Sequence, residues 1–287
     1  MLPQAIVNGL LFGSVYATIG IGFSLVWGVM NIINVAHGSF IMIGAYLSYT
    51  LFALYGLDPF LSIPPVMAVL FLLAYAIQKY VLNRVVRGSV FITLTFTFGL
   101  QILIANLCLL LWSADSRSIK LPYSSAGWQI GGLVIPLVRL GIFGVALLLT
   151  GLFYLFMRRT RTGVAINATA LNFEGAKTVG IDVYNIYAIT FGVSAALAGA
   201  AGCLISPIMS INPFGGGPLV AKAFVIAILG GLGSTVGALV GGLALGLVET
   251  VGTVFISSSF QELLGFTVLV LVLVFRPQGL MGKRFYE

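Results

Sequence analysis

The stretch 158–183, RRTRTGVAINATALNFEGAKTVGIDV, decides how the rest of this chain is arranged. It holds four of the fourteen basic residues and two of the seven acidic residues, and apolar segments flank it on both sides. Short loops that are rich in Lys and Arg stay on the cytoplasmic side of a membrane protein. Because Arg158, Arg159 and Arg161 lead this insert, we expect it to lie in the cytoplasm.

Apolar residues in the insert recur at helical spacing. Ile166, Ala170, Phe173 and Ala176 lie four, three and three residues apart, which predicts a short amphipathic helix at the membrane surface. Gly180 is a natural stop for that helix. Two interpretations compete: an interfacial helix that lies among the lipid headgroups, and a docking helix for a soluble partner.

Composition places most of the chain in lipid. Of its 287 residues 60% are hydrophobic and 7% are charged, whereas soluble domains carry about 25% charged residues. The mean hydropathy is +1.13. We expect one integral membrane domain over residues 1–287, without a cleaved signal peptide, because the N-terminus lacks a basic region. The net charge of +7 does not indicate nucleic-acid binding. The basic residues cluster at the ends of apolar segments, where they set topology and meet lipid headgroups.

The residue types needed for catalysis are scarce. The sequence has one His and seven carboxylate residues, and it lacks the nucleotide-binding pattern Gly-x4-Gly-Lys-Ser/Thr. Cys108 and Cys203 lie in apolar segments and are expected to be buried as small hydrophobic residues. We therefore expect no enzyme activity, no cofactor and no metal site. Any energy from ATP must come from another polypeptide.

Apolar runs of about 20 residues predict the membrane segments. Ten of the fourteen Lys and Arg residues fall in 79–87, 158–177 and 276–284, so these regions are predicted to be cytoplasmic and the N-terminus to be outside. The external loop 113–140 carries turn signals that predict a short hairpin. The piece 219–232 is short for a span, so it either crosses or re-enters the membrane, which gives eight or nine segments. The other expected segments are 5–30, 36–56, 60–81, 89–112, 141–157, 184–209, 235–255 and 263–275.

Polar residues at membrane depth are candidates for the lining of a substrate path. Asn34 and His37 lie beside a suspected helix break, and the alternative for them is a simple turn at the interface. Thr93 and Thr97 share one helix face, where interhelical hydrogen bonding is the simpler role. Glu249 is the carboxylate expected nearest to membrane depth. A pairing role is an equal alternative for it, with Lys222 as a conceivable partner.

Both suspected breaks carry a similar pattern of small residues. The pair Gly-Ser at 38–39 precedes Gly-Ala at 44–45, and Gly-Ser at 233–234 precedes Gly-Ala at 237–238. Paired interruptions in two halves point to a substrate path between inverted repeats. Chance matches in a glycine-rich chain are the alternative.

Several segments together resemble the permease subunits of bacterial ABC importers for branched-chain or neutral amino acids. They are NVAHGSF (34–40) with GAY (44–46), RTRTG (159–163), AILGGLGS (227–234) with GA (237–238), and FRPQGL (275–280). The segment EGAKTVG (174–180) is also similar to the loop signature of such permeases, which runs Glu-Ala-Ala, three residues, Gly. Gly175 stands here in place of the first Ala, which lowers helix propensity by about 1 kcal/mol.

The resemblance implies an all-α polytopic membrane protein of about eight membrane helices with a cytoplasmic coupling helix. The coupling residues would be Phe173, Glu174, Gly175, Ala176 and Gly180. It also implies an importer of the bacterial inner membrane. Such an importer combines two permease subunits, identical or different, with two cytoplasmic ATPase subunits and a periplasmic amino-acid-binding protein.

Two other functions stay open. Related permeases carry urea or another small amide. A stand-alone secondary transporter or channel would use Glu249 or His37 for ion coupling, but the large basic insert would then have no evident role.

Overall fold

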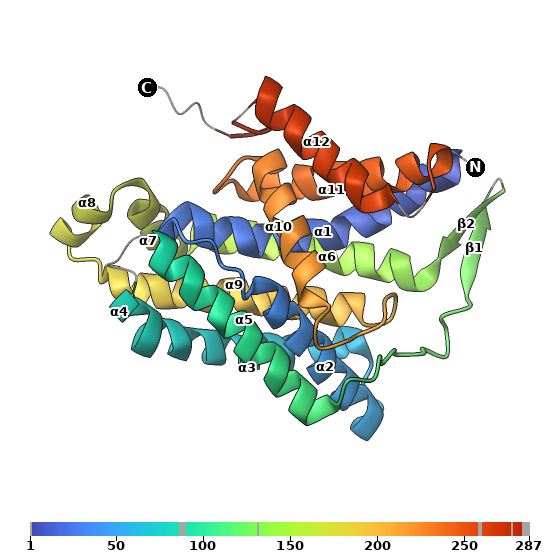
Figure 1. The fold of residues 1–287 in the computed structure, drawn as a ribbon, viewed down its shortest axis with the longest axis horizontal. Helices are drawn as coiled ribbons and strands as arrows, with labels where there is room; N and C mark the ends of the chain where they lie inside the picture. Colours follow the sequence, from blue (N-terminus) through green and yellow to red (C-terminus); the bar gives the residue numbers. More distant parts are fainter. Residues whose placement is uncertain (1, 86–89, 131, 258–259, 277, 283–287) are drawn as a thin grey trace.

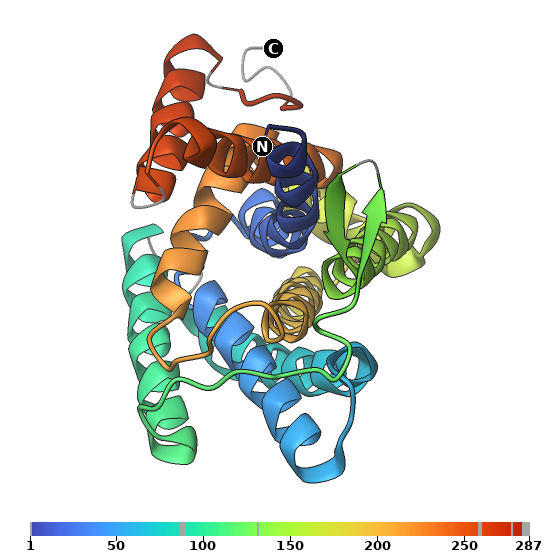
Figure 2. The same ribbon diagram turned by 90° about the vertical axis from the view of Figure 1, so that its right-hand side faces the viewer.

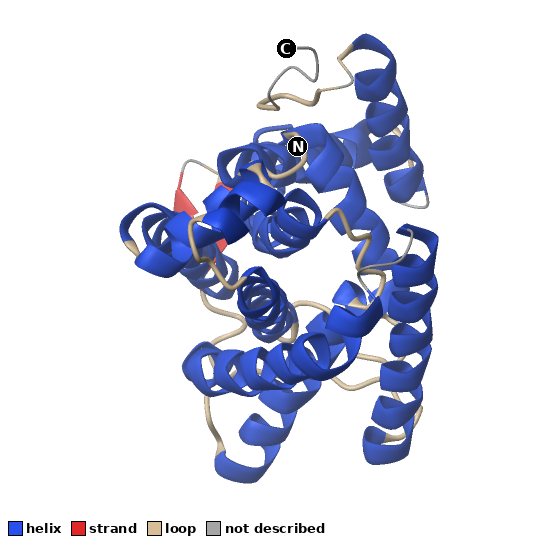
Figure 3. Cartoon of the chain, turned by 90° about the vertical axis from the view of Figure 1, so that its left-hand side faces the viewer, coloured by secondary structure: helices blue, strands red, loops and turns tan. Residues whose placement is uncertain are grey.

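The computed structural model describes residues 2–85, 90–130, 132–257, 260–276 and 278–282. In this part of the chain the fold is helical apart from one small hairpin, as Figure 3 shows. Two helices are apolar but short, α10 (Gly216–Gly230) and α12 (Gln261–Phe275). Seven helices of the described residues are long and apolar enough to cross a membrane. They are α1 (Leu2–Met30), α2 (His37–Tyr55), α3 (Pro59–Ile77) with its continuation, α5 (Val90–Trp112), α6 (Leu137–Arg159), α9 (Val183–Ile205) and α11 (Thr235–Phe255).

This architecture confirms the prediction of an all-α polytopic membrane protein, and the long helices start and end within a few residues of the expected segments. The third span is longer than expected, because it continues through a π-helical turn, η1 (Gln78–Leu82), into α4 (Asn83–Val85). Arg87, Lys283 and Arg284 are among the basic residues counted above, Ser89 begins an expected segment, and Pro277 belongs to the quoted segment 275–280. These five residues lie outside the described part of the chain.

The external loop contains the predicted hairpin. Strands β1 (Gly127–Ile130) and β2 (Leu133–Pro136) pair antiparallel, with Trp128 opposite Ile135. The side chain of Gln4 in α1 bonds the backbone of Val134 twice, at 2.8 and 2.9 Å. The hairpin is therefore fastened to the first turn of the first helix.

A second contact fastens the same loop to α3. Asp58 caps α3, since its Oδ1 accepts a hydrogen bond from the Phe60 amide at 2.9 Å. The Tyr123 hydroxyl donates to the other carboxylate oxygen of Asp58. Burial, together with this hydrogen bond and the charge of Asp58, raises the pKa of Tyr123 above its ordinary value.

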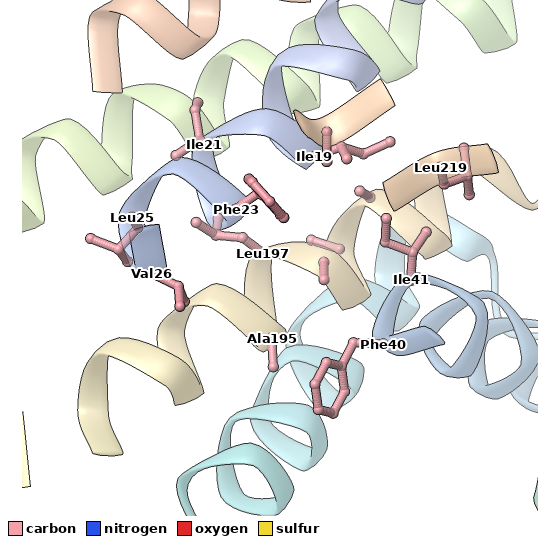
Figure 4. Close-up of a cluster of buried hydrophobic side chains, with 14 of the residues drawn as sticks. Ile19, Ile21, Phe23, Leu25, Val26, Phe40, Ile41, Ala195, Leu197 and Leu219 are labelled. Carbon is pink, nitrogen blue, oxygen red and sulfur yellow. The ribbon is translucent and has the colours of Figure 1, made fainter. Parts of the chain in front are cut away.

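Helices α1 and α9 form the centre of the molecule, and the other helices surround them (Figure 2). In each of these two helices, 89% of the residues in an apolar stretch of 18 residues are buried. Figure 4 shows part of the apolar core around them, to which Phe23 of α1, Leu197 of α9 and Ile41 of α2 belong. A helix that is apolar on every side belongs in such an interior.

Small residues bring the central helices into backbone contact. Gly9, Gly13 and Ala17 recur every four residues on α1 and face Gly242 and Gly246 of α11. A Cβ added to Gly246 would lie 2.5 Å from the Gly13 Cα. Lipid tails are as apolar as the side chains, so close backbone packing, rather than hydrophobic burial, joins helices in a membrane.

The small residues of the 184–209 segment act in the same way. A Cβ on Gly44 of α2 would lie 2.5 Å from the Gly199 Cα of α9, and a Cβ on Gly202 would lie 2.1 Å from the Ile41 carbonyl oxygen. These glycines therefore allow α9 and α2 to approach closely.

Helices α2 and α10 begin inside the bundle rather than at its ends. The chain leaves α1 at Met30 and turns at Asn31, which has a φ of 53°. It then runs back, so that His37, the first residue of α2, contacts the Ile19 carbonyl oxygen. Ile19 is eleven residues before Met30, about 16 Å along the helix.

The start of α10 lies at the start of α2, because a Cβ on Gly38 would lie 2.0 Å from the Gly216 carbonyl oxygen. Helix α10 therefore starts within the bundle, and its 15 residues measure about 22 Å. The chain after α9 re-enters the bundle before α10, and α10 itself does not cross the whole width.

The two ends of the molecule differ in charge. Figure 1 shows α4, α8 (Phe173–Thr178) and the C-terminal end of α12 at one end, and the N-terminus with the hairpin at the other. The first end carries Lys79, Arg84, Arg158, Arg159 and Arg276. This arrangement follows the pattern of a cytoplasmic and an external end.

We predict that Gly246→Ala lowers the stability of the folded chain by about 1–3 kcal/mol, because the added methyl group overpacks a backbone contact with α1. The matched control is Gly151→Ala in α6, where nothing lies within 4 Å of the added Cβ. Thermal unfolding in detergent measures both. Equal melting temperatures for the two variants would contradict the packing argument.

Candidate functional site

The insert 158–183 forms two helices rather than the single helix that its spacing predicts. They are α7 (Arg161–Leu171) and α8 (Phe173–Thr178). Asn172 is extended between them, and its Oδ1 accepts a hydrogen bond from the Gly175 amide at 2.8 Å, so it caps α8. Ile166 and Ala176 are buried as expected, but Ala170 is exposed. The apolar spacing continues through Asn172, although this residue separates the two helices and caps α8. The spacing alone therefore did not reveal two helices.

Gly180 ends the helical part of the insert, as predicted. Its φ of 84° is left-handed, a conformation that costs glycine little. The Gly180 amide donates to the Lys177 carbonyl and the Ile181 amide donates to the Ala176 carbonyl, both at 3.0 Å. This is the Schellman arrangement, which satisfies the last carbonyls of α8.

The predicted coupling residues divide into an anchor and an exposed surface. Phe173 packs against α9, with ring centroids 6.4 Å from Tyr184 and 6.1 Å from Tyr187. Glu174 projects outward with its side chain 78% exposed, and Lys177 lies 3.6 Å from it. Gly175 makes contact with the capping side chain of Asn172. Phe173 therefore fixes the position of α8, and Glu174 forms an exposed ion pair with Lys177.

Two exposed apolar residues beside α8 were missed by the sequence analysis. Leu171 at the end of α7 is 81% exposed and Val179 after α8 is 74% exposed. Together with Glu174 they give this end an apolar surface with a negative charge. Their signal in the sequence was weak, because both fall outside the apolar spacing that was used to find the helix.

The suspected break at 31–36 is present, and the two path candidates beside it, Asn34 and His37, are buried in the protein. His37 is fully buried, its Nε2 lies 3.0 Å from the Ile19 carbonyl oxygen, and its ring meets Phe23 edge-on. Asn34 is 2% exposed, and its Oδ1 has no hydrogen-bond partner among the described residues. The structure places His37 in the packed core and leaves Asn34 with an unused acceptor.

Thr97 ties this break to α5. Its hydroxyl oxygen accepts from the Val35 amide at 3.3 Å and lies 2.9 Å from the Ile33 carbonyl oxygen, to which it can donate. Thr93, one turn earlier and also buried, bonds only within its own helix, to the Val90 carbonyl. Of the two predicted path residues, Thr97 therefore has a role in holding the break.

Glu249 and Lys222 come together, although 27 residues separate them. Both carboxylate oxygens of Glu249 lie 2.7 Å from the Lys222 Nζ. The Tyr16 hydroxyl donates to Glu249 at 2.9 Å, and the Gln261 side-chain amide donates to it at 3.0 Å. Glu249 is 1% exposed, so a satisfied ion pair lies in the apolar interior where α1, α10, α11 and α12 meet. The pair of Lys222 and Glu249 is suggested by the sequence, but no sequence pattern pointed to Tyr16 or Gln261.

The predicted site residues thus occupy three places: the α7–α8 end, the break with Thr97, and the cluster around Glu249. Among the described residues no group of three or more His, Cys, Asp or Glu side chains could hold a metal ion. Polar groups at membrane depth bonded across helices are typical of transport proteins.

Comparison with known families decides the class of this protein. Residues 5–273 match the model of the branched-chain amino acid transport system permease component. The chain belongs to this family. The match covers every helix from α1 into α12, including the three places described above.

Two relatives of the permease are similar to it over nearly their whole length. The high-affinity branched-chain amino acid transport system permease protein BraD of Pseudomonas aeruginosa is 36% identical, covering 98% of this chain and 95% of the relative. The corresponding protein LivH of Escherichia coli K12 is 33% identical with the same coverage. A more distant relative, LivM of the same organism, is 26% identical and covers 98% of this chain and 71% of LivM.

A solved structure supports the fold of the permease. A chain of PsaBC from Streptococcus pneumoniae in complex with Fab has a TM-score of 0.53 and 18% sequence identity, covering 96% of this chain and 92% of that chain. At this identity the likeness concerns the fold alone.

We predict that Thr97→Val lowers the stability of the permease by about 1–3 kcal/mol, because the Val35 amide loses its buried partner. Thr95→Val is the control, since Thr95 is exposed and bonds only within its own helix. Thermal unfolding of both variants in detergent is the measurement. A melting temperature of Thr97→Val no lower than that of Thr95→Val would argue against a role for Thr97 in holding the break.

Proposed function

We propose that this permease is the membrane-spanning subunit of an ATP-driven importer that carries branched-chain and other neutral amino acids across the bacterial inner membrane. The observation that carries the proposal is the full-length similarity to BraD and LivH, whose names state that transport activity. Few charged groups lie at membrane depth in the described residues, which suits small, net-neutral, largely apolar substrates.

The partners follow from what the chain lacks and exposes. It has no nucleotide-binding loop, so two cytoplasmic ATPase subunits would supply the energy. A periplasmic amino-acid-binding protein would deliver the substrate. A second permease subunit would complete the path, either as a copy or as a related chain. The similarity to both LivH and LivM supports a partner of the same family.

Helix α8 is the proposed contact with the ATPase. Its anchor, Phe173, is held by α9, while Glu174, Leu171 and Val179 remain exposed at the basic end of the molecule. A partner can shift a two-state element only through contacts that differ between the states. Because the Phe173 ring packs against α9, a displacement of α8 by the partner would move α9 as well, instead of bending α8 alone.

The proposal is tested by reconstitution. The permease, its ATPases and its second subunit are placed in proteoliposomes with the binding protein, and uptake of leucine and of urea is measured with and without ATP. Leucine uptake that requires ATP supports the proposal. Uptake by the chain alone under an ion gradient would establish a secondary transporter, and uptake of urea alone would establish an amide permease.

We predict that Glu174→Lys reduces ATP-driven uptake by about tenfold or more, because a central interface residue contributes about 2 kcal/mol or more. Insertion and thermal stability should stay unchanged, since Glu174 is exposed. Asp115→Lys is the control, an equal charge change in the exposed external loop. Normal uptake by Glu174→Lys would count against the docking role.

We predict that a thiol placed at Thr178 is labelled by a membrane-impermeant maleimide only from the cytoplasmic side. Thr178 is exposed at the end of α8, and the two natural cysteines are buried and should react little. The matched variant Ser124→Cys lies in the exposed external loop and should react only from outside. Labelling of Thr178→Cys from outside would reverse the orientation.

A further inference from the structure

A narrow cleft opens beside the buried ion pair. Its space between α10, α11 and α12 is about 30 Å³, which is room for a water molecule. Small-molecule sites occupy about 300–1,000 Å³, so a ligand can enter only when the wall formed by α12 moves outward. Its polar wall consists of Lys222, Glu249 and Glu262, and its apolar wall includes Val225, Leu245 and Phe266.

Stability does not explain why a Lys and a Glu occupy this place. Taking two charges out of water costs about as much as their attraction returns, and an apolar pair of the same volume is often as stable or more stable. Charged residues at membrane depth are costly and are associated with transport paths. The ion pair therefore serves a role other than stability, one that two apolar side chains could not fill.

We propose that this cleft recognises the charged head of a zwitterionic α-amino acid by exchange of partners. The α-carboxylate would bind the Lys222 ammonium, and the α-ammonium would bind the Glu249 carboxylate. The aliphatic side chain would lie against Leu245 and Phe266. This inference rests on the proposed function and names the residues that read the substrate.

Exchange keeps every buried charge paired. The ion pair carries no net charge, and neither does the zwitterion, so one pair becomes two and no charge is left alone. Tyr16 of α1 donates to Glu249 and holds its carboxylate in place while the side chain of Lys222 moves away. Gly265 lets α12 pack closely against the pair, because a Cβ there would lie 3.2 Å from the Glu249 Oε1.

Glu262 gives the cleft a second carboxylate beside its one cation. The exposed Glu262 lines the cleft next to Glu249. An acidic side chain on the substrate would meet like charge there. A substrate without the carboxylate would leave Lys222 unpaired, and one without the ammonium would leave Glu249 unpaired.

The first test distinguishes substrate recognition by the ion pair from a role of the pair in stability alone. In Lys222→Met alone Glu249 stays buried and unpaired, so melting temperature and leucine uptake should both fall. The double variant Lys222→Met/Glu249→Leu replaces the pair with apolar groups, so its melting temperature and its assembly with the ATPase should recover. Its leucine uptake should remain about tenfold or more below that of the wild type. The control Asp115→Leu/Lys120→Met removes one charge of each sign from the exposed external loop and should take up leucine normally.

The second test needs no variant. Leucine should raise the melting temperature of the wild-type permease in detergent. Leucinamide, which lacks the carboxylate, and 2-hydroxy-4-methylpentanoate, which lacks the ammonium, should not. Equal stabilisation by either analogue, or leucine uptake by the double variant at the wild-type level, would overturn the inference. If instead the wild-type complex takes up no leucine in the presence of ATP, the proposed transport function itself is contradicted.

Discussion

Backbone contact between helices is the interaction on which the rest of this structure depends. In lipid, apolar side chains gain little by leaving the solvent, so the central helices are joined where glycines let their backbones touch. Gly13 of α1 meets Gly246 of α11, and Gly44 of α2 meets Gly199 of α9.

The contact between Gly13 and Gly246 also brings together two residues of the buried cluster. Tyr16 and Glu249 each lie three residues after a contacting glycine, on antiparallel helices. Side chains lean toward the N-terminus of their own helix, so both reach back to the level of that contact and meet at 2.9 Å.

The second constraint is that backbone polar groups at membrane depth need partners within the protein. Both helix breaks meet it with side chains from neighbouring helices. Thr97 serves Ile33 and Val35 at the first break. At the second break, Ser24 accepts a hydrogen bond from the Gly233 amide at 3.0 Å. These serine and threonine hydroxyls therefore stabilise the two breaks, the first before α2 and the second between α10 and α11.

Much of the fold could be predicted because lipid imposes a simple rule on sequence. Length and apolarity located the long helices, and the charges at their ends gave an orientation that the two ends of the structure follow. Glycine at 180 and the hairpin turn signals were also correct, because local backbone geometry decides both. Pattern could not show that α10 starts inside the bundle, since its depth depends on Gly38, a residue far away in sequence.

The candidate site was less predictable for the same physical reason. Glu249 and Lys222 were paired in advance, because an isolated charge is costly at membrane depth. Tyr16 and Gln261 were missed, since either could lie at any point around a helix whose neighbours were unknown. Ala170 was assigned to the buried face because apolar spacing continues through Asn172, and only the cap of α8 interrupts it. Phe173 was expected to face a partner, yet its ring is used to anchor α8.

Differences in how the helices are joined show where the cleft can open. Helix α11 touches α1 through Gly246 and touches α10 through Gly241, in both cases at backbone atoms. Those three helices can separate only by losing close packing along their length. Helix α12 meets α11 through side chains instead: Leu264 lies over Gly252, and Gly265 faces Leu245. Side-chain contacts can rearrange by changes of rotamer, whereas backbone contacts cannot. Glu249 and Lys222 therefore sit on the fixed wall of the cleft, and α12, which carries Gln261, Glu262 and Phe266, is the wall whose contacts can rearrange to admit a ligand.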